Sequence, residues 1–379
     1  MPVERLLPTD EAHDLIALAR DFADKRMAPI VDDHERNHTY PDGLFAELGA
    51  AGLLGLPYPE EWDGGGQPYE VYLQVLEEFG ARWASVAVAI SVHGLACHPL
   101  MNFGTDEQRR RWLPDLLNGR LIGAYSLSEP QAGSDAAALN CRATPVDGGF
   151  RVNGAKAWIT HGGIADVYNL FARTGEGSKG ISCLLVPADT EGLGFGKPED
   201  KMGLHAVPTT AASYDDAFVD EDRLLGAQGQ GLSIAFSALD AGRLGIAAVA
   251  TGLAQAALDA AVDYAQERTT FGRKIIDHQG LSFVLADMSA AVDSARATYL
   301  DAARRRDAGM DYSRAAATAK LVATDAAMKV TTDAVQVFGG YGYTRDFPVE
   351  RYMREAKITQ IFEGTNQIQR LVIGRTLAR

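Results

Sequence analysis

The sequence has little cysteine and lacks the usual metal-binding spacings. Three cysteines, Cys97, Cys141 and Cys183, are spread over 379 residues, and none forms a CxxC pair. That spacing argues against a disulfide framework or a structural zinc site and suits a reducing compartment. The eight histidines include no HExxH pair, so the sequence predicts no metal site.

Basic residues are also in deficit, since 36 lysines and arginines face 50 aspartates and glutamates, for a net charge of -14. A surface of that sign repels phosphate backbones and anionic lipid headgroups, so we expect no nucleic-acid partner and no membrane partner. A long apolar run is missing as well. The least polar stretch, 244–262, is interrupted by Gln255 and Asp259, which predicts a packed bundle helix rather than a membrane span.

A basic, apolar targeting segment is absent from the start of the sequence, where Glu4, Asp10 and Glu11 stand instead. We therefore expect Met1 to be the mature start and the protein to be cytoplasmic, of bacterial type.

The composition itself is globular, with 46% hydrophobic and 23% charged residues, and the length exceeds one domain of the usual ~100 to 200 residues. Residues 1–120 predict an α-helical domain. Thr9 or Asp10 is placed to cap a helix ahead of apolar residues at helical spacing, and breaks at 63–68 and Gly104 separate further helices.

Residues 121–228 change to short β-branched runs between turn signals. Asn153-Gly154 predicts a two-residue hairpin turn, and 167–172 and 181–186 predict further strands. We expect a central antiparallel β barrel or sandwich domain.

Residues 229–379 return to long Ala-rich segments at 232–269, 279–307 and 312–338. Small side chains let helices approach closely, which favours a C-terminal four-helix bundle and also suits subunit interfaces. The predicted fold class is thus α+β multidomain, in the order helix, sheet, helix.

Three segments carry possible chemistry. The stretch 125–135 runs from a strand into a loop rich in hydroxyls and glycine, suited either to binding a polar ring edge or phosphate, or to an ordinary capped turn. Gly339 and Gly340 end an Ala-rich helix and would serve as a C-cap in any protein. Glu363 precedes a helix start marked by Asn366.

Glu363 is flanked by Ile361 and Phe362. Desolvation in such a setting raises a carboxyl pKa toward the range useful for a general base, while the alternative is a solvated loop glutamate. The string from Gly226 to Gly231 has the wrong spacing for a nicotinamide fingerprint.

In their order and spacing these segments resemble the acyl-CoA dehydrogenase family, from Leu15 to Arg379. Further motifs that carry the resemblance are 156–160, 267–273 with His278-Gln279, and 350–357 leading into Glu363. The resemblance implies the same three-domain fold with FAD held between the β domain and the C-terminal bundle.

By similarity, the flavin is faced by Tyr125, Leu127, Ser128, Gly133, Ser134, Trp158, Ile159 and Thr160, with Trp158 covering the isoalloxazine. The resemblance places three residues against the FAD of a neighbouring subunit, which implies a homotetramer: Arg268, Phe271 and Gln279. The rest of the implied FAD site is Gln336, Val337, Gly339, Gly340, Thr365 and Gln367.

The resemblance also implies the chemistry. Glu363 removes an α proton while hydride leaves the β carbon for flavin N5, the acyl-CoA becomes the trans-2-enoyl-CoA, and electrons pass to an electron-transferring flavoprotein. The thioester oxygen would be held by the Glu363 backbone N–H and a flavin ribityl hydroxyl. Implied substrate contacts are Ser134, Asp240, Arg243 and Gly364, and the implied pathway is breakdown of fatty acids or branched-chain amino acids.

Some members of the family carry the base next to the arginine that matches Arg243, but Gly242 stands here. Val207 and Pro208 replace residues that are small and polar or acidic in many members, so the contacts of that loop differ. No Lys or Arg lies between Trp83 and Gln108, which favours an uncharged acyl tail, short or branched.

Two rival functions share the scaffold. A flavin oxidase would pass electrons to oxygen, but larger acyl-CoA oxidases do not fit this length. A non-catalytic binding relative, for example a DNA-binding one, would be expected to have lost the base at the position of Glu363 or to carry a basic surface.

Overall fold

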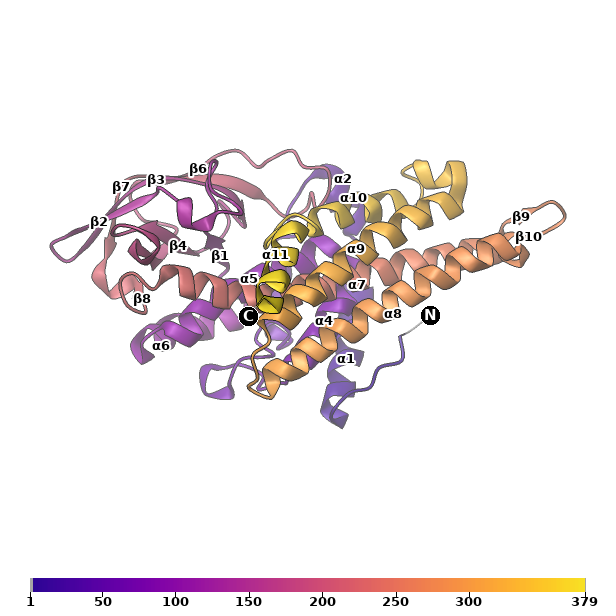
Figure 1. Ribbon diagram of the computed structural model, residues 1–379, viewed down its shortest axis with the longest axis horizontal. Coiled ribbons are helices and arrows are strands. Elements are labelled where there is room, and N and C mark those ends of the chain that lie inside the picture. Colours follow the sequence, from indigo (N-terminus) through magenta and orange to yellow (C-terminus); the bar gives the residue numbers. More distant parts are fainter. Residues whose placement is uncertain (1–2, 379) are drawn as a thin grey trace.

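The computed structural model describes residues 3–378 and consists of a helical domain, a β domain and a second helical domain along the chain (Figure 1). This order confirms the predicted fold class. The expectation that Met1 is the mature start lies outside the described residues.

The N-terminal domain is helical, and its boundaries follow the signals read from the sequence. Thr9 caps the first helix by accepting a hydrogen bond from Ala12 N at 3.1 Å, as predicted. Pro68 directly precedes α4 and Gly104 directly follows α5. The helices are α1 Asp10–Phe22, α2 Val31–Asn37, α3 Leu44–Ala50, α4 Tyr69–Arg82, α5 Ala84–Phe103 and α6 Asp106–Leu117.

The β domain is one eight-stranded sheet in the order β6-β7-β3-β2-β4-β5-β8, with β1 added parallel to β4. Most neighbours are antiparallel, but the β1–β4 and β2–β4 pairs make the sheet mixed. The strands are β1 Gly123–Ser126, β2 Arg142–Val146, β3 Gly149–Thr160, β4 Val167–Arg173, β5 Ile181–Pro187, β6 Leu193–Phe195, β7 Thr209–Asp220 and β8 Leu224–Leu225.

The predicted hairpin turn at Asn153-Gly154 is wrong, because both residues lie inside β3. The turn between β2 and β3 is made by Asp147 and Gly148 instead. Gly154 marks an irregularity in the β3–β7 register, and a Cβ there would approach Cys141 Cα to 2.7 Å. The glycine therefore serves a bulge and a close approach, which imitate a turn signal in the sequence.

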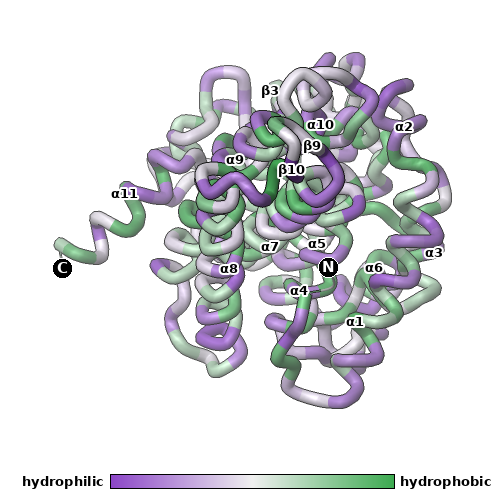
Figure 2. Tube along the Cα trace, turned by 90° about the vertical axis from the view of Figure 1, so that its right-hand side faces the viewer, coloured by the Kyte–Doolittle hydropathy of each residue, from purple (hydrophilic) through white to green (hydrophobic). Residues whose placement is uncertain are grey.

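The C-terminal domain is a bundle of long helices that pack through alanine and glycine. α7 Gly231–Glu267, α8 Gln279–Asp307 and α9 Ser313–Phe338 match the predicted segments, and they are followed by α10 Val349–Thr359 and α11 Asn366–Leu377. Between α7 and α8 the chain forms a short hairpin, β9 Thr269–Thr270 and β10 Arg273–Lys274. Figure 1 shows this hairpin projecting from the end of the bundle opposite the β domain, and Figure 2 shows α11 extending away from the body.

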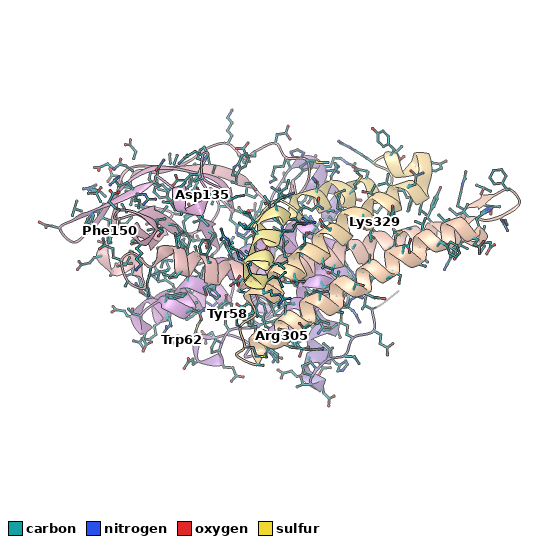
Figure 3. The ribbon with its side chains drawn as sticks, viewed as in Figure 1. Tyr58, Trp62, Asp135, Phe150, Arg305 and Lys329 are labelled. Atoms are coloured by element: carbon teal, nitrogen blue, oxygen red, sulfur yellow. The ribbon has the colours of Figure 1, made fainter. Side chains whose placement is uncertain are left out.

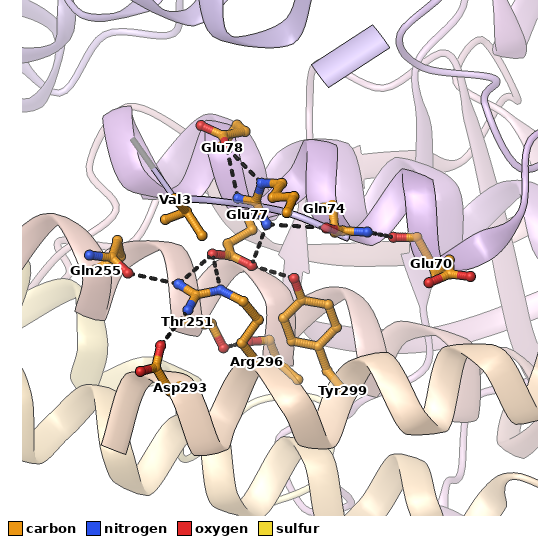
Figure 4. A network of polar contacts seen from close by, with 12 residues as sticks. Val3, Glu70, Gln74, Glu77, Glu78, Thr251, Gln255, Asp293, Arg296 and Tyr299 are labelled. Atoms are coloured by element: carbon orange, nitrogen blue, oxygen red, sulfur yellow. Dashed lines mark hydrogen bonds and ion pairs between the residues drawn. The ribbon is translucent and has the colours of Figure 1, made fainter. Parts of the chain in front are cut away.

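A buried charge network joins the two helical domains (Figure 4). Glu77 of α4 pairs with Arg5 at 3.1 Å and with Arg296 of α8 at 2.9 Å, and Tyr299 also donates to it. Burial alone would raise the pKa of Glu77, but the two arginines lower it overall. The network ties the N-terminal segment and α4 to the bundle as one packed unit.

By length and apolar composition alone, α5 and α7 would each suffice to cross a membrane, so Gln255 and Asp259 do not by themselves exclude a span at 244–262. In the fold, 89% of the apolar window of α5 and 72% of that of α7 are buried within the protein. Such burial is typical of core helices, and α7 packs against both α4 and α5 of the N-terminal domain.

Candidate active site

The Glu363 loop connects α10 to α11 and is held in an unusual backbone conformation. Glu363 has φ +50° and Gly364 has φ +87°, so two successive residues lie in the left-handed region. Thr365 then caps α11 by accepting from Ile368 N at 3.3 Å, one residue earlier than predicted. A strained non-glycine residue of this kind persists only where its surroundings fix it.

Lys320 of α9 supplies much of that fixation from beneath the loop. Its fully buried Nζ donates to Gly364 O at 3.0 Å and to Asn366 Oδ1 at 2.9 Å. Gln369 Nε2 also donates to Gly364 O at 2.7 Å, and Asn366 Nδ2 donates to Asp325 at 2.7 Å. The loop is therefore anchored by three side chains, none of which points to a function in the sequence alone.

The Glu363 carboxylate is buried, and neither of its oxygens accepts a hydrogen bond from the residues that the structure describes. Burial raises its pKa to about 7, although Lys320 and Arg243 act in the opposite direction. The alternative of a solvated loop glutamate is thus wrong. A carboxylate with a pKa near neutrality is suited to general-base work.

Gly242 of α7 makes the room for this carboxylate. A Cβ added at Gly242 would collide with Glu363 Oε2 and lie 3.1 Å from Leu95 Cδ1. One residue on, Arg243 is buried and forms an ion pair with Asp240, which also accepts from Ser313 Oγ at 3.1 Å. The predicted substrate contacts Asp240 and Arg243 therefore adjoin Glu363, as does Gly364.

A cavity of about 220 Å³ opens beside this group, between α4, α5, α7 and the end of α8. Leu95, Ala241 and Gly242 line it close to Glu363, whereas His98, Asn102 and Arg306 are polar lining groups. A cation therefore reaches the cavity from α8, although the stretch of α5 from which an uncharged acyl tail was expected contains none.

The face of the β domain beside α7 carries the first half of the expected flavin site. Trp158 has φ +63° and is 63% exposed, which is unusual for so large an apolar side chain. Tyr125 donates from its hydroxyl to Ala235 O of α7 at 3.1 Å. Burial chiefly raises the pKa of Tyr125 and the Glu363 charge adds to the rise, so Tyr125 lies within electrostatic reach of the base.

A buried ion pair holds this face together. Lys156 Nζ donates to Glu129 Oε1 at 2.8 Å and to Leu127 O at 2.9 Å, joining the 127–135 loop to β3 two residues before Trp158. Glu129 also accepts from Cys141 N at 2.9 Å. The loop leaves Ser134 exposed, and Gly133 has open space where a side chain would be. Ser128 and Thr160 are half-buried, and Leu127 and Ile159 are buried.

The second half of the expected flavin site lies at the opposite end of the bundle (Figure 1). Arg268, Phe271 and Gln279 are exposed on and beside the β9–β10 hairpin, and Phe271 is 97% exposed. Tyr264 stacks on Phe338 with ring centroids 4.2 Å apart, which brings the end of α9 to this hairpin. There Gly339, at φ +61°, ends the helix as predicted, with Gln336 and Gly340 exposed and Val337 buried.

The structure thus divides the expected site residues into two groups. Glu363 lies within electrostatic reach of Tyr125 on the β-domain face, Thr365 follows two residues later as the N-cap of α11, and Gln367 is exposed on α11. An exposed aromatic ring, free hydroxyls and open backbone on that face fit a large planar cofactor. Among the described residues, no three His, Cys, Asp or Glu side chains are placed to hold a metal ion. Fold and site together define a class of enzyme with a desolvated carboxylate beside a face that fits a large planar cofactor.

Comparison with known proteins agrees with this class. Three family models match in succession: acyl-CoA dehydrogenase N-terminal domain at residues 9–120, middle domain at 124–217 and C-terminal domain at 229–378. The chain therefore belongs to the acyl-CoA dehydrogenase family, whose members are FAD-dependent flavoproteins.

Individual relatives cover nearly the whole chain. An acyl-CoA dehydrogenase of Bacillus subtilis (strain 168) is 44% identical over 97% of this chain and 98% of its own. The structure of butyryl-CoA dehydrogenase from Megasphaera elsdenii has a TM-score of 0.97 at 41% identity, covering 99% of this chain and 100% of that chain. A chain from the structure of the electron transferring flavoprotein of Acidaminococcus fermentans also has a TM-score of 0.97, at 42% identity, with the same coverage.

Sequence reasoning missed Lys320, Gln369 and Arg306. Lys320 had a weak signal, since it is a cation between Ala319 and Leu321 in an Ala-rich helix. Arg306 had none, because it is one of three successive arginines and only the fold decides which of them turns inward.

Proposed function

We propose that this protein dehydrogenates a short-chain acyl-CoA between its α and β carbons, giving the trans-2-enoyl-CoA, with Glu363 as the base. The observation that carries the proposal is the Glu363 carboxylate, which is buried, unpaired and seated against Gly242 beside an acyl-sized cavity. The cavity volume of about 220 Å³ is below the roughly 300 to 1,000 Å³ of pockets for drug-sized ligands, which supports a short tail.

The residues of the chain divide the work as follows. Glu363 in its ionised form takes the α proton, and its raised pKa lets it hold that proton near neutral pH. An α C–H is acidic enough only if donors hold the thioester oxygen as charge develops, and we assign one of them to the Glu363 backbone N–H. FAD, when bound, accepts the hydride that leaves the β carbon.

The anchored loop supports the assignment of the oxygen donor. Lys320 and Gln369 both donate to Gly364 O, and Gln369 also donates to Glu363 O at 3.4 Å, so the backbone that follows Glu363 cannot turn without breaking these hydrogen bonds. Ser134, Asp240, Arg243 and Gly364 are the proposed substrate contacts. Because Glu363 supplies both the base and the oxygen donor, a rigid loop keeps the two groups in a constant position relative to each other.

We propose that each FAD site combines residues of two subunits in a homotetramer. One subunit supplies Tyr125, Leu127, Ser128, Gly133, Ser134, Trp158, Ile159, Thr160, Thr365 and Gln367. Its neighbour supplies Arg268, Phe271, Gln279, Gln336, Val337, Gly339 and Gly340. The separation of the two groups along the bundle supports this division, because one subunit does not bring them together.

The electron acceptor is proposed to be an electron-transferring flavoprotein. This rests on the match to a chain from such a structure. A cytoplasmic location is proposed from the bacterial source of these two relatives.

We propose domains at 1–120, 121–228 and 229–379, whose limits fall between α6 and β1 and between β8 and α7.

The test is anaerobic titration of the purified flavoprotein with acyl-CoAs, following the visible flavin absorbance. Butyryl-CoA should bleach the wild-type protein, and Glu363→Gln should slow bleaching by ~10² to 10⁴-fold, the usual contribution of a general base. Glu363→Gln keeps the shape of the side chain, so its FAD content serves as the control for folding. A protein without flavin, or one that no thioester bleaches, would overturn the proposal.

A further inference from the structure

Arg306 forms the charged wall of the cavity beside Glu363. Its guanidinium carbon lies 3.6 Å from the ring centroid of Tyr69, and Tyr58, Tyr69 and Tyr72 line the same cavity. Figure 3 labels Tyr58, which lines the cavity, and Arg305, which directly precedes Arg306 in the sequence. The arginine is therefore held in place by ring stacking at the cavity wall.

Arg306 differs from its neighbours in having no carboxylate partner among the described residues. Arg304 pairs with Glu70 at 2.8 Å and Arg305 pairs with Asp301 at 2.7 Å, both at the surface. Burial alone would lower the pKa of Arg306, but the nearby Tyr69 and Tyr312 hydroxyls raise it overall. The next residue, Asp307, is directed elsewhere, since it accepts from Tyr69 N at 2.9 Å and from Glu70 N at 3.2 Å.

We propose that Arg306 sets the length of the acyl chain that the enzyme accepts, an inference that rests on the proposed function. The cavity is apolar near the base, where Leu95, Ala241 and Gly242 line it, and carries a guanidinium on another wall. A short chain is covered by the apolar part and leaves Arg306 hydrated. A longer chain displaces that hydration from an unpaired cation.

The energetic reason is the asymmetry between burying a charge with and without a partner. A guanidinium stripped of water by a methyl end gains no hydrogen bond in return, so each further methylene loses its usual gain. His98 and Asn102 add polar groups to the same cavity. His98 Nε2 lies 2.9 Å from Ser237 Oγ, and Asn102 Nδ2 donates to His98 O at 2.9 Å, so both are already engaged within the fold.

A substrate with a terminal carboxylate would use the same cation as an ion-pair partner, and the experiment separates this case. The kcat/KM for butyryl-CoA, hexanoyl-CoA, octanoyl-CoA and glutaryl-CoA is measured for the wild-type protein, Arg306→Met, Arg306→Lys and Arg305→Met. Methionine keeps the length of the arginine stem without its charge. Arg305→Met is the matched control, because it removes an arginine one residue away that points to the surface.

The expected result is a rise of about tenfold or more in the ratio of kcat/KM for hexanoyl-CoA to butyryl-CoA in Arg306→Met, within the range that a methylene pocket discriminates. Arg306→Lys and Arg305→Met should keep the wild-type ratio. If Arg306→Met does not retain FAD, Arg306→Gln supplies the same comparison.

An unchanged ratio in Arg306→Met, or in Arg306→Gln where it is used instead, would overturn the inference while wild-type turnover of butyryl-CoA still supported the proposed function. Wild-type turnover of glutaryl-CoA that is lost in Arg306→Met would overturn it too, in favour of an anion site. Absence of turnover with every thioester, in the wild type and in Arg305→Met, would remove the proposed function and the inference together.

Discussion

At the scale of single residues, Glu363 and Lys320 share one buried site and influence each other's protonation. Burial raises the pKa of Glu363 to about 7 and lowers the pKa of Lys320 to about 7, although each charge opposes the shift of the other. The pKa of Glu363 in the folded protein exceeds the value of 4.5 for an unperturbed glutamate. Its contribution to folding stability is therefore complete below pH 4.5 and is lost as the pH rises through about 7.

Activity should have the opposite pH dependence, because only the ionised carboxylate accepts the α proton. We expect the rate of flavin reduction by butyryl-CoA to rise through about pH 7. Lys320→Met removes a charge that favours ionisation of Glu363, so its rising limb should move to higher pH. Stopped-flow absorbance at a series of pH values measures the rising limb of the wild-type protein and that of Lys320→Met.

Lys329→Met is the control for this substitution. Lys329 lies on the same helix but pairs with Asp333 at the surface, so its loss should leave the pH profile in place. A Lys320→Met profile that coincides with that of Lys329→Met would show that Lys320 has no electrostatic effect on the base.

The candidate site could be predicted only as far as residue patterns express it. Glu363 and Gly242 stand next to recognisable motifs, so the base and the glycine beside Arg243 were visible in the sequence. Lys320 and Arg306 were not, because their effect depends on which side of a helix meets a neighbour more than 40 residues away along the chain, and composition carries no such information.

At the scale of elements, α7 joins packing and catalysis in one helix. Gly242, Gly245 and Gly252 lie in its interior, and a Cβ at any of them would collide with an atom of another segment. The clash at Gly242 is with the Glu363 carboxylate, whereas Gly252 meets the backbone of α4. Glycine weakens a helix by about 0.5 to 1 kcal/mol relative to alanine, so these positions are kept for close approach.

Gly242→Ala should therefore retain the fold and lose activity. The added methyl displaces the Glu363 carboxylate, and a shift of about 1 Å at a reacting group costs on the order of 10²-fold in rate. Single-turnover flavin reduction by butyryl-CoA, with the melting temperature recorded alongside, measures the effect. Gly374→Ala on α11, where nothing lies within 4 Å, is the matched control, and equal rates in the two variants would contradict the argument.

The elements themselves were predictable to different degrees. The Ala-rich helices α7, α8 and α9 match the sequence prediction within about two residues, because long periodic segments are unambiguous. The prediction of a turn at Asn153-Gly154 was wrong, since the same two residues occur in a bulge as readily as in a turn. Only the pairing with β7, some 60 residues away, distinguishes the two.

At the scale of the whole molecule, the two groups of cofactor residues belong to opposite ends of the subunit. Phe271 on the β9–β10 hairpin is almost fully exposed, so a neighbouring subunit or cofactor that covered it would remove a large apolar area from water. Phe271→Ser should weaken FAD binding by about 10- to 150-fold, as expected for loss of a buried aromatic contact of about 1.5 to 3 kcal/mol.

The measurement is the FAD content after gel filtration at falling protein concentration, with the subunit mass determined in the same run. Phe218→Ser on β7, a partly exposed phenylalanine of the β domain, is the control. Full FAD retention by a Phe271→Ser monomer would show that one subunit binds the cofactor alone.

The last turn of α8 also has a consequence for motion. Arg306 faces the acyl cavity, while Asp307 accepts the hydrogen bonds of the Tyr69 and Glu70 amides at the start of α4. The joint between the first and last domains is therefore made by the residue that directly follows Arg306, and its opening sets how fast those two amide protons exchange with solvent. The exchange rates of Tyr69 and Glu70 thus report the stability of this joint at the edge of the cavity, without any turnover.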